Sequence, residues 1–337
     1  MARRTAEKLV FLGNGLQEYE LEDLLSSDAE VLAKGTFGTT YKTNLELRSI
    51  KKTVAVKRLK VDRLSEGEFR ENIEELGKMV HENLLPIRAY CSTDSERLLI
   101  YDYMNAGSLS FFLHGKTESK IGQGREELGQ GRLAFSQKQF VLSSILGKSA
   151  GNGVGTKAPL TWNVRCSIAY GVARGIAYIH TKGSDICHGN IRSSNVLLTN
   201  SFDACISDFC IYKLFPPTCK LNLIVGYRAP EVTDPNEVSQ KSDVYSFGVL
   251  LLELLTGKVP LSVLHGGVDL PKWVRAMFQE KPIIDLFDAM LPKYENNGEQ
   301  MVQLLQLAVC CTFENPSKRP SIAAATDRIE HICRFKQ

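Results

Sequence analysis

The sequence predicts an α+β protein in which a small strand-rich part precedes a large helical part. From about residue 19 to residue 99, short runs of alternating apolar residues are separated by turn signals, and TVAVKRL at 53–59 is the clearest predicted strand. Beyond this region, longer apolar patterns have the spacing of helices. The chain has 337 residues, of which 43% are hydrophobic, so it can bury a core in each of two lobes.

Five segments have the apolar spacing of helices. The segment 65–80 interrupts the strands as an amphipathic helix. The segment 162–180 predicts a long helix, and 243–257 predicts a second one that is apolar all round and therefore buried. Two further amphipathic helices are expected at 299–313 and 321–335.

Two of these helices allow predictions for individual residues. The helix at 65–80 is expected to bury one apolar face, formed by Phe69, Ile73, Leu76 and Val80. The buried helix at 243–257 has a candidate cap at each end, Asp243 at its start and Gly257 after its last turn.

Residues 115–159 fit neither lobe. They are rich in Gly, Ser, Lys and Gln, which is the composition of a disordered surface insertion. Two alternatives stay open for this segment. FVLSSIL at 140–146 could dock a partner, or the whole segment could be an artefact of the gene model.

The composition argues against several classes of protein. A formal charge of +3 and the lack of recognition motifs argue against a nucleic-acid partner. Nine cysteines without zinc spacing indicate reduced thiols in a cytosolic core. The first 15 residues lack the apolar stretch of a signal peptide, and the most apolar run, 245–255, is shorter than the roughly 20 residues of a membrane span. We therefore expect a soluble chain.

Four stretches in one order indicate the chemistry of bound phosphates. In LAKGTFGTTYK at 32–42, glycines would let backbone N–H groups approach a phosphate closely. Lys57 follows on a predicted strand. Asn195, in the loop ICHGNIRSSNVLL, and Asp208 are hard oxygen ligands that suit Mg²⁺ bound to phosphates. A glycine hairpin or a solvated lysine would be ordinary alone, but the order and spacing together indicate a nucleotide cleft.

With these stretches the chain resembles a eukaryotic protein kinase domain from about residue 8 to residue 333, apart from the insertion. It is most similar to the cytoplasmic domain of plant leucine-rich-repeat receptor-like kinases. The stretches that carry this resemblance are LLIYDYMNAGSLSFFLHG, GYRAPEVTDPNEVSQKSDVYSFGVLLLELLTGKVP and PSKRPS. Within that group, the loop HGNIRSSN resembles members described as atypical or inactive.

The resemblance implies a bilobal protein-kinase fold, with a small strand-rich N-lobe that contains one helix and a large helical C-lobe. The implied boundaries are a juxtamembrane-like segment at 1–28, an N-lobe at 29–103 and a C-lobe at 104–333 that includes the insertion 115–159. It also implies a place on the cytoplasmic side of the plasma membrane. The membrane segment that would hold the domain there is absent from this sequence.

The resemblance further implies a nucleotide site and one ion pair. The residues expected around ATP are Leu32, Gly35, Gly38, Ala55, Lys57, Asp102, Met104 and Leu197. The expected metal ligands are Asn195 and Asp208, so ATP and Mg²⁺ are candidate cofactors. The alternative is a cleft that stays empty and collapsed. In the C-lobe, Arg319 is expected to pair with Glu231.

Five positions depart from the pattern of active kinases. They are Ala33, Asn72, Asn190, Cys210 and Ile224. Asn190 stands where the catalytic base would be, and an amide cannot accept a proton. Asn72 stands where a helix glutamate would orient Lys57, although Glu71 or Glu75 could substitute from other faces of the helix.

The other three of these five departures lie in loops, and two further residues, Arg192 and Gly189, also differ from active kinases. Ala33 replaces the first glycine of the phosphate loop, Cys210 replaces the glycine of the metal-binding turn, and Ile224 replaces a threonine that links substrate to the catalytic loop. Arg192 keeps the charge of a lysine that would touch the γ-phosphate, and Gly189 removes an arginine that would bind a phosphorylated activation segment. The phosphoacceptors of that segment are Tyr212, Thr218 and Tyr227.

These departures favour a pseudokinase that signals by binding proteins, in particular an active co-receptor kinase. One alternative is a slow Ser/Thr kinase, because the loss of a general base costs roughly 10²–10⁴ in rate and would not abolish turnover alone. A second alternative is a truncated product without function, suggested by the insertion and the missing membrane anchor.

Overall fold

The computed structural model describes residues 8–13, 19–46, 51–60, 64–93, 96–115, 160–216, 226–234, 237–260, 269–280, 282–291 and 297–333. The chain divides into two compact units. The strand-rich unit comprises Met1–Val61, Ile87–Tyr103 and Lys116–Ala158, and the helical unit comprises Asp62–Pro86, Met104–Gly115 and Pro159–Gln337. Thr218, Ile224 and the predicted insertion, apart from Gly115, lie outside the described residues.

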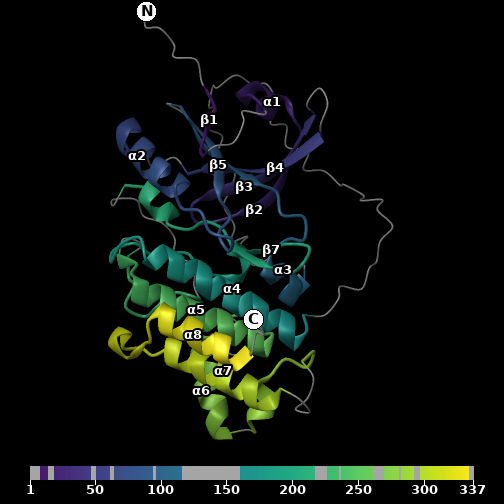
Figure 1. Cartoon of the computed structure of the whole chain (residues 1–337), viewed down its shortest axis with the longest axis vertical. Helices are drawn as coiled ribbons and strands as arrows, with labels where there is room; N and C mark the ends of the chain where they lie inside the picture. Colours follow the sequence, from purple (N-terminus) through teal and green to yellow (C-terminus); the bar gives the residue numbers. More distant parts are fainter. Residues whose placement is uncertain are drawn as a thin grey trace, which may run out of the picture. The chain divides into compact units, whose positions relative to one another are not determined.

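The strand-rich unit is built on one six-stranded antiparallel sheet (Figure 1). Its strands lie in the order β1-β5-β6-β4-β3-β2. Their bounds are β1 Val10–Phe11, β2 Ala29–Lys34, β3 Gly38–Glu46, β4 Lys51–Leu59, β5 Ile87–Ser92 and β6 Arg97–Asp102. The strand predicted at 53–59 is confirmed within β4, where β-branched and apolar residues lie between two neighbouring strands.

The residues before β2 contribute to the core of this unit. Strand β1 pairs with β5, and the short helix α1 spans Leu21–Ser26. Leu9, Tyr19, Leu21 and Leu24 are all buried, in one cluster with Leu45, Val54, Val56, Ala89, Cys91, Leu98 and Ile100 of the sheet. The segment 19–28 therefore packs as part of the sheet's apolar face.

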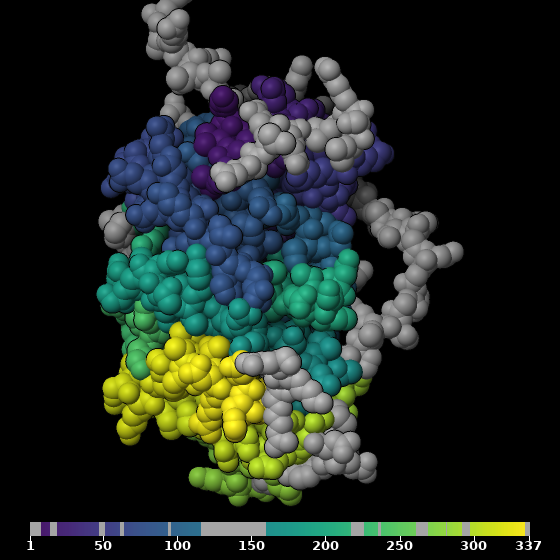
Figure 2. All heavy atoms as spheres, in the orientation of Figure 1, coloured from purple at the N-terminus to yellow at the C-terminus, as the bar shows by residue number. Residues whose placement is uncertain are grey.

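In the helical unit, the helices surround one buried helix, α5. Its helices are α2 Glu66–Gly77, α3 Leu109–His114, α4 Trp162–His180, α5 Gln240–Thr256, α6 Leu270–Glu280, α7 Gly298–Cys311 and α8 Ile322–Cys333. Helix α5 is buried along nearly its whole length, and α4 and α7 both pack against it (Figure 1). Helix α8 packs on α4 and α7 and buries Ile322, Ala325, Ile329 and Ile332, and its other face is at the surface in Figure 2.

The same unit contains a small two-stranded sheet and several short 3₁₀ helices. Strands β7 Val196–Leu198 and β8 Ala204–Ile206 pair antiparallel. The 3₁₀ helices are η2 Ser193–Asn195, η3 Ile211–Leu214, η6 Ile283–Leu286 and η7 Pro316–Lys318. The residues predicted for catalysis and metal binding lie in and next to these elements: Asn190 and Arg192 precede η2, Asn195 is its last residue, and Asp208 lies between β8 and η3.

The five predicted helices are found nearly in position, as α2, α4, α5, α7 and α8, with two errors of detail, whereas α1, α3 and α6 were not predicted. Helix α2 buries Phe69, Ile73 and Leu76, but Val80 is 72% exposed, because the helix ends at Gly77 and Val80 no longer follows its period. Helix α5 begins three residues earlier than predicted. Its N-cap is Ser239, so the prediction that Asp243 caps it is wrong.

Two further predictions for the helical unit are confirmed. Gly257 ends α5 with a left-handed φ of 65°, and its N–H donates to the carbonyl of Glu253. Arg319 forms an ion pair with Glu231, with 2.6 Å between Nη1 and Oε1. Among the described residues, no helix combines the length and the apolar character that crossing a membrane requires.

Candidate functional site

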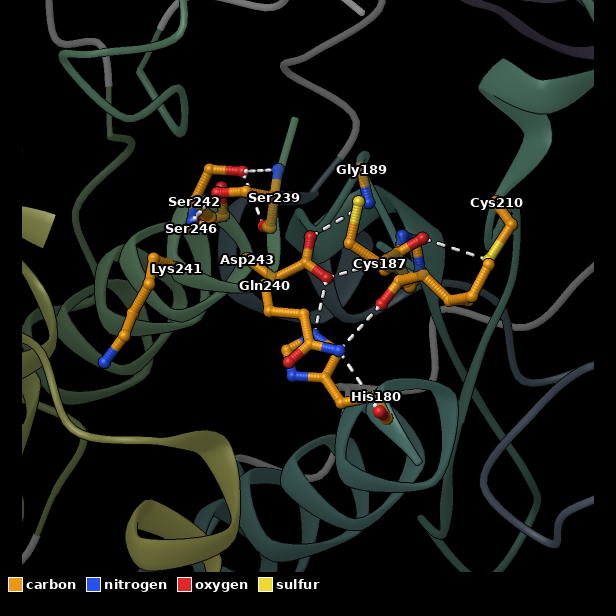
Figure 3. Close-up of polar contacts among 12 residues, drawn as sticks. His180, Cys187, Gly189, Cys210, Ser239, Gln240, Lys241, Ser242, Asp243 and Ser246 are labelled. Atoms are coloured by element: carbon orange, nitrogen blue, oxygen red, sulfur yellow. Dashed lines mark hydrogen bonds and ion pairs between the residues drawn. The ribbon is translucent and has the colours of Figure 1, made fainter. Parts of the chain in front are cut away.

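The loop that leads into β7 is held by the carboxylate of Asp243. Its Oδ2 accepts a hydrogen bond from the backbone N–H of His188 at 2.6 Å, and its Oδ1 accepts one from Gly189 at 2.9 Å. The carboxylate is 2% exposed. Figure 3 shows Asp243 pointing from α5 toward this loop and toward His180, whose Nε2 lies 2.9 Å from Oδ2. Hydrogen bonds to an ionised carboxylate are strong, so Asp243 holds the backbone of this loop in place.

Two neighbouring side chains complete this support. The Gln240 amide donates to the backbone carbonyls of His180, Gly183 and Ile186 at 2.8–3.1 Å (Figure 3). Complete burial lowers the pKa of His188, so its imidazole is neutral. Its Nδ1 accepts from the N–H of Asn190 at 3.2 Å. The loop therefore keeps the architecture of a catalytic loop.

Asn190 occupies the position predicted for the catalytic base. Its backbone carbonyl accepts from Nδ2 of Asn195 at 2.8 Å. Its side-chain Nδ2 is buried and has no hydrogen-bond partner among the described residues. A carboxylate at this place would accept a proton, whereas the amide nitrogen can only donate a hydrogen bond. The backbone at this position is thus held by a hydrogen bond, but the side chain can no longer act as a base.

The two predicted metal ligands lie at the same end of the β7–β8 hairpin. Asn195 immediately precedes β7, and Asp208 is the second residue after β8. Ser207 connects them, because its N–H and its hydroxyl both donate to the carbonyl of Asn195, at 2.9 and 3.2 Å. Asp208 has a φ of 62°, which is uncommon for a residue with a side chain. An amide and a carboxylate oxygen suit a hard cation such as Mg²⁺.

Asn195 and Asp208 are not part of a larger cluster of metal-binding side chains in the described part of the chain. Among the described residues, no group of three or more His, Cys, Asp or Glu side chains could hold a metal ion. Any Mg²⁺ at Asn195 and Asp208 would therefore need further oxygen ligands from phosphates or water, as is usual for this ion.

Lys57 and the glycine loop belong to the strand-rich unit. Lys57 is 6% exposed, on β4 between Thr40 of β3 and Leu99 of β6. In the loop between β2 and β3, the N–H of Gly35 donates to the carbonyl of Gly38 at 2.8 Å. A Cβ at Gly38 would lie 2.1 Å from the carbonyl oxygen of Arg58, so this position requires glycine.

Two features of this loop weaken it as a phosphate cradle. The Gly35 N–H that would face a phosphate is already bonded within the loop, and Thr36 and Phe37 at its tip are buried. Ala33 is exposed on the edge strand β2, next to Leu32, which is 43% exposed. The loop is a tight hairpin in the described structure.

The residues predicted around adenine are divided between the units. Ala55 and Asp102 are half-buried on the neighbouring strands β4 and β6, and the Asp102 carboxylate pairs with exposed Arg88 at 2.6 Å. Met104 and Leu197 belong to the helical unit. Because Lys57 lies in one unit and Asn195 and Asp208 in the other, their predicted convergence on one nucleotide stays a prediction.

The sequence did not indicate a buried polar network around Glu253 of α5. Its carboxylate is fully buried and accepts from the Ser193 hydroxyl at 2.8 Å and from the Tyr227 hydroxyl. Nε2 of His114 at the end of α3 lies 2.7 Å from the same carboxylate. Three segments distant in sequence therefore meet at one side chain, and no local pattern in the sequence marks them.

Neither described tyrosine of the predicted activation segment presents a free hydroxyl. Tyr227 is bonded in the Glu253 network, and burial followed by the Glu253 charge raises its pKa. The Tyr212 hydroxyl accepts from the thiol of Cys187 at 3.4 Å, and burial raises its pKa as well. In this conformation both tyrosines are poor phosphoacceptors.

Comparison with protein families gives a match that covers most of the chain. The family described as protein tyrosine and serine/threonine kinase matches residues 27–329. Two Arabidopsis thaliana proteins named as probable inactive receptor kinases are 44% and 45% identical over 97% of this chain. Another, named as a probable leucine-rich repeat receptor-like protein kinase, is 41% identical over 96% of it.

This chain covers only 44–45% of the length of these relatives. Among solved structures, it is similar to the pseudokinase domain of BIR2, described as an immune regulator of the RLK/Pelle family. The TM-score is 0.73 at 27% sequence identity, over 97% of this chain and 90% of that one. The fold predicted from the sequence is thereby confirmed.

Proposed function

Because this chain belongs to the protein tyrosine and serine/threonine kinase family, we propose that it is a pseudokinase domain, which transfers phosphate weakly or not at all and signals by binding proteins. Asn190 carries this proposal. The loop around it is held by Asp243 as a catalytic loop would be, yet its side chain cannot take a proton from a substrate hydroxyl. The names of the relatives and of the structural neighbour support the same conclusion.

The site retains part of what nucleotide binding needs. Protein kinase domains bind ATP with Mg²⁺. Asn195 and Asp208 fit this metal by the chemistry of their oxygens, and Mg²⁺ held there would neutralise phosphate charge. Against tight binding stand the bonded N–H of Gly35 and the substitution of Asn72 for a glutamate. We therefore infer weak binding of ATP.

The receptor relatives suggest the setting in which this domain acts. They are named receptor kinases, a class of membrane-associated protein. We infer that the domain works on the cytoplasmic side of the plasma membrane and that its partner is an active co-receptor kinase. Binding of that kinase would replace catalysis as its contribution to signalling.

Phosphate transfer from labelled ATP with Mg²⁺ tests the proposal, with Lys57→Met as the control. We expect the purified chain to incorporate no more label than Lys57→Met does. Incorporation well above this control, together with a further gain in Asn190→Asp, would support a slow Ser/Thr kinase instead. A thermal shift at millimolar ATP tests binding separately, since a ligand that binds only the folded state raises Tm.

A further inference from the structure

The residues that follow Asp208 and Phe209 are buried within the helical unit. Helix η3, Ile211–Leu214, is followed by Phe215, and Ile211, Leu214 and Phe215 are at most 4% exposed. Cys210 caps the start of η3 with a left-handed φ of 54°. Its N–H donates to the carbonyl of His188 at 3.0 Å. Its thiol donates to the carbonyl of Cys187, also at 3.0 Å (Figure 3). A glycine at this position could not make the second bond.

The ring of Tyr212 lies against Gly189. A Cβ at residue 189 would come within 2.8 Å of Cδ1 and 3.1 Å of Cε1 of this ring. Gly189 also has a φ of 74°, which disfavours any side chain. The arginine that active kinases carry at this position would occupy the space that Tyr212 fills. Gly189 therefore makes room for the ring, and the Cys187 thiol bonds its hydroxyl.

The third contact comes from α2. The side-chain amide of Asn72 donates to the backbone carbonyl of Lys213 at 2.8 Å. A glutamate at this position, as active kinases have, could not donate a hydrogen bond and would place its charge against the carbonyl oxygen. Asn72 is thus chemically suited to hold η3 and unsuited to orient a lysine.

We propose that Asn72, Gly189 and Cys210 form a latch that holds residues 210–215 of this chain in a closed conformation. Three of the positions that depart from active kinases then stabilise the closed segment, in addition to removing a function that active kinases need. This latch would regulate the same site, so its biological meaning rests on the proposed function. The three contacts that form it do not depend on that function.

Trypsin provides a direct test, because Asn72 binds the carbonyl of the bond that trypsin would cut, Lys213–Leu214. Cleavage of a folded chain requires local opening, so its rate reports the population of the open form. For Asn72→Leu we expect cleavage after Lys213 to be roughly fivefold to tenfold faster, the effect of one lost hydrogen bond. Glu74→Leu, at an exposed position of the same helix, should cleave at the wild-type rate.

Cleavage after exposed Lys182 serves as an internal standard and should be unchanged in both variants. If Asn72→Leu is cut after Lys213 no faster than Glu74→Leu, Asn72 does not hold the segment and the latch is wrong. Because this measurement uses no nucleotide, its result is independent of the kinase assay. A negative result here would contradict the latch but not the proposed pseudokinase function, and catalytic activity in the kinase assay would contradict that function but not the latch.

A double-mutant cycle tests the contact between Gly189 and Tyr212. Gly189→Ala is strained by its φ in any background, but it collides with the ring only where Tyr212 is present. We expect Gly189→Ala to accelerate cleavage after Lys213 by a clearly larger factor in the wild type than in Tyr212→Ala. Equal factors in both backgrounds would show that the ring does not pack there, which would overturn the latch.

Discussion

Arg319 and Glu231 form a two-pronged ion pair, with 2.6 Å from Nη1 to Oε1 and 2.7 Å from Nη2 to Oε2. The guanidinium is completely buried, and its remaining N–H groups donate to backbone carbonyls of Phe313, Glu314 and Lys241. One side chain thereby connects the segment before α8 to the start of α5 and to Glu231.

Replacing Arg319 with lysine should lower the free energy of unfolding by about 3 kcal/mol. A lysine carries the same charge but lacks the planar fork, so several buried carbonyls and one carboxylate oxygen would lose their donors. Urea unfolding followed by circular dichroism measures the change. Arg58→Lys is the control, since Arg58 pairs with Glu96 at the surface and should cost less than about 1 kcal/mol. Equal losses in the two variants would contradict this role.

Asp243→Asn should destabilise the loop that contains Asn190 by about 2 kcal/mol, because hydrogen bonds to a charged acceptor are lost and an NH₂ group faces N–H donors. Hydrogen exchange of the His188 and Gly189 amides should rise more than exchange in α7. Asp185→Asn, at an exposed position near the same loop, should leave both amides protected. Unchanged protection of His188 in Asp243→Asn would refute the prediction.

Two glycine-to-alanine substitutions should change the free energy of unfolding in opposite directions. At Gly248 of α5, a Cβ would lie 2.7 Å from Cβ of Cys311 and 2.8 Å from Cγ2 of Thr312, so α5 and α7 would have to separate. We expect a loss of about 1–3 kcal/mol. At Gly67 of α2, nothing lies within 4 Å, and alanine should stabilise by up to about 1 kcal/mol. Thermal unfolding of both variants provides the comparison.

Stability should fall as the pH rises above about 10, because Tyr245 keeps its proton longer in the folded state. Burial, and next the Asp269 carboxylate, raises the pKa of Tyr245 to about 12, from 10 in the unfolded chain. The folded state then keeps its proton when the unfolded state has lost it, so stability is full below pH 10 and is lost between pH 10 and 12. Tyr245→Phe should therefore lose about 1.4 kcal/mol less than the wild type between pH 8 and pH 11. Identical pH profiles would contradict this assignment.

Local features of the sequence predicted most of the helices, because periodicity and caps are properties of neighbouring residues. Helix α4 has the bounds expected, and Gly257 ends α5 as predicted. The start of α5 was misplaced because Ser239 and Asp243 are both good N-caps, and only the capping box with Ser242 distinguishes them. Val80 continued the apolar period of α2 beyond the point where the helix ends.

The site was predictable where it depends on short spacings. Asn195 and Asp208 flank a hairpin of adjacent strands, so their closeness follows from the local sequence. The bond from Asn72 to Lys213 joins residues 141 positions apart, and it depends on how α2 packs on η3. The Glu253 network likewise needs three segments to be placed first. Such contacts follow from tertiary packing, which a single sequence does not reveal.

The burial of Leu9, Tyr19, Leu21 and Leu24 on the sheet has a practical consequence for protein expression. A fragment cut at residue 29, the predicted start of the N-lobe, would uncover apolar partners such as Leu45, Val54 and Ile100 and would remove the strand that pairs with β5. Exposed apolar surface and an unpaired strand edge both promote aggregation. A shortened version made for crystallisation or binding studies should therefore begin no later than residue 8.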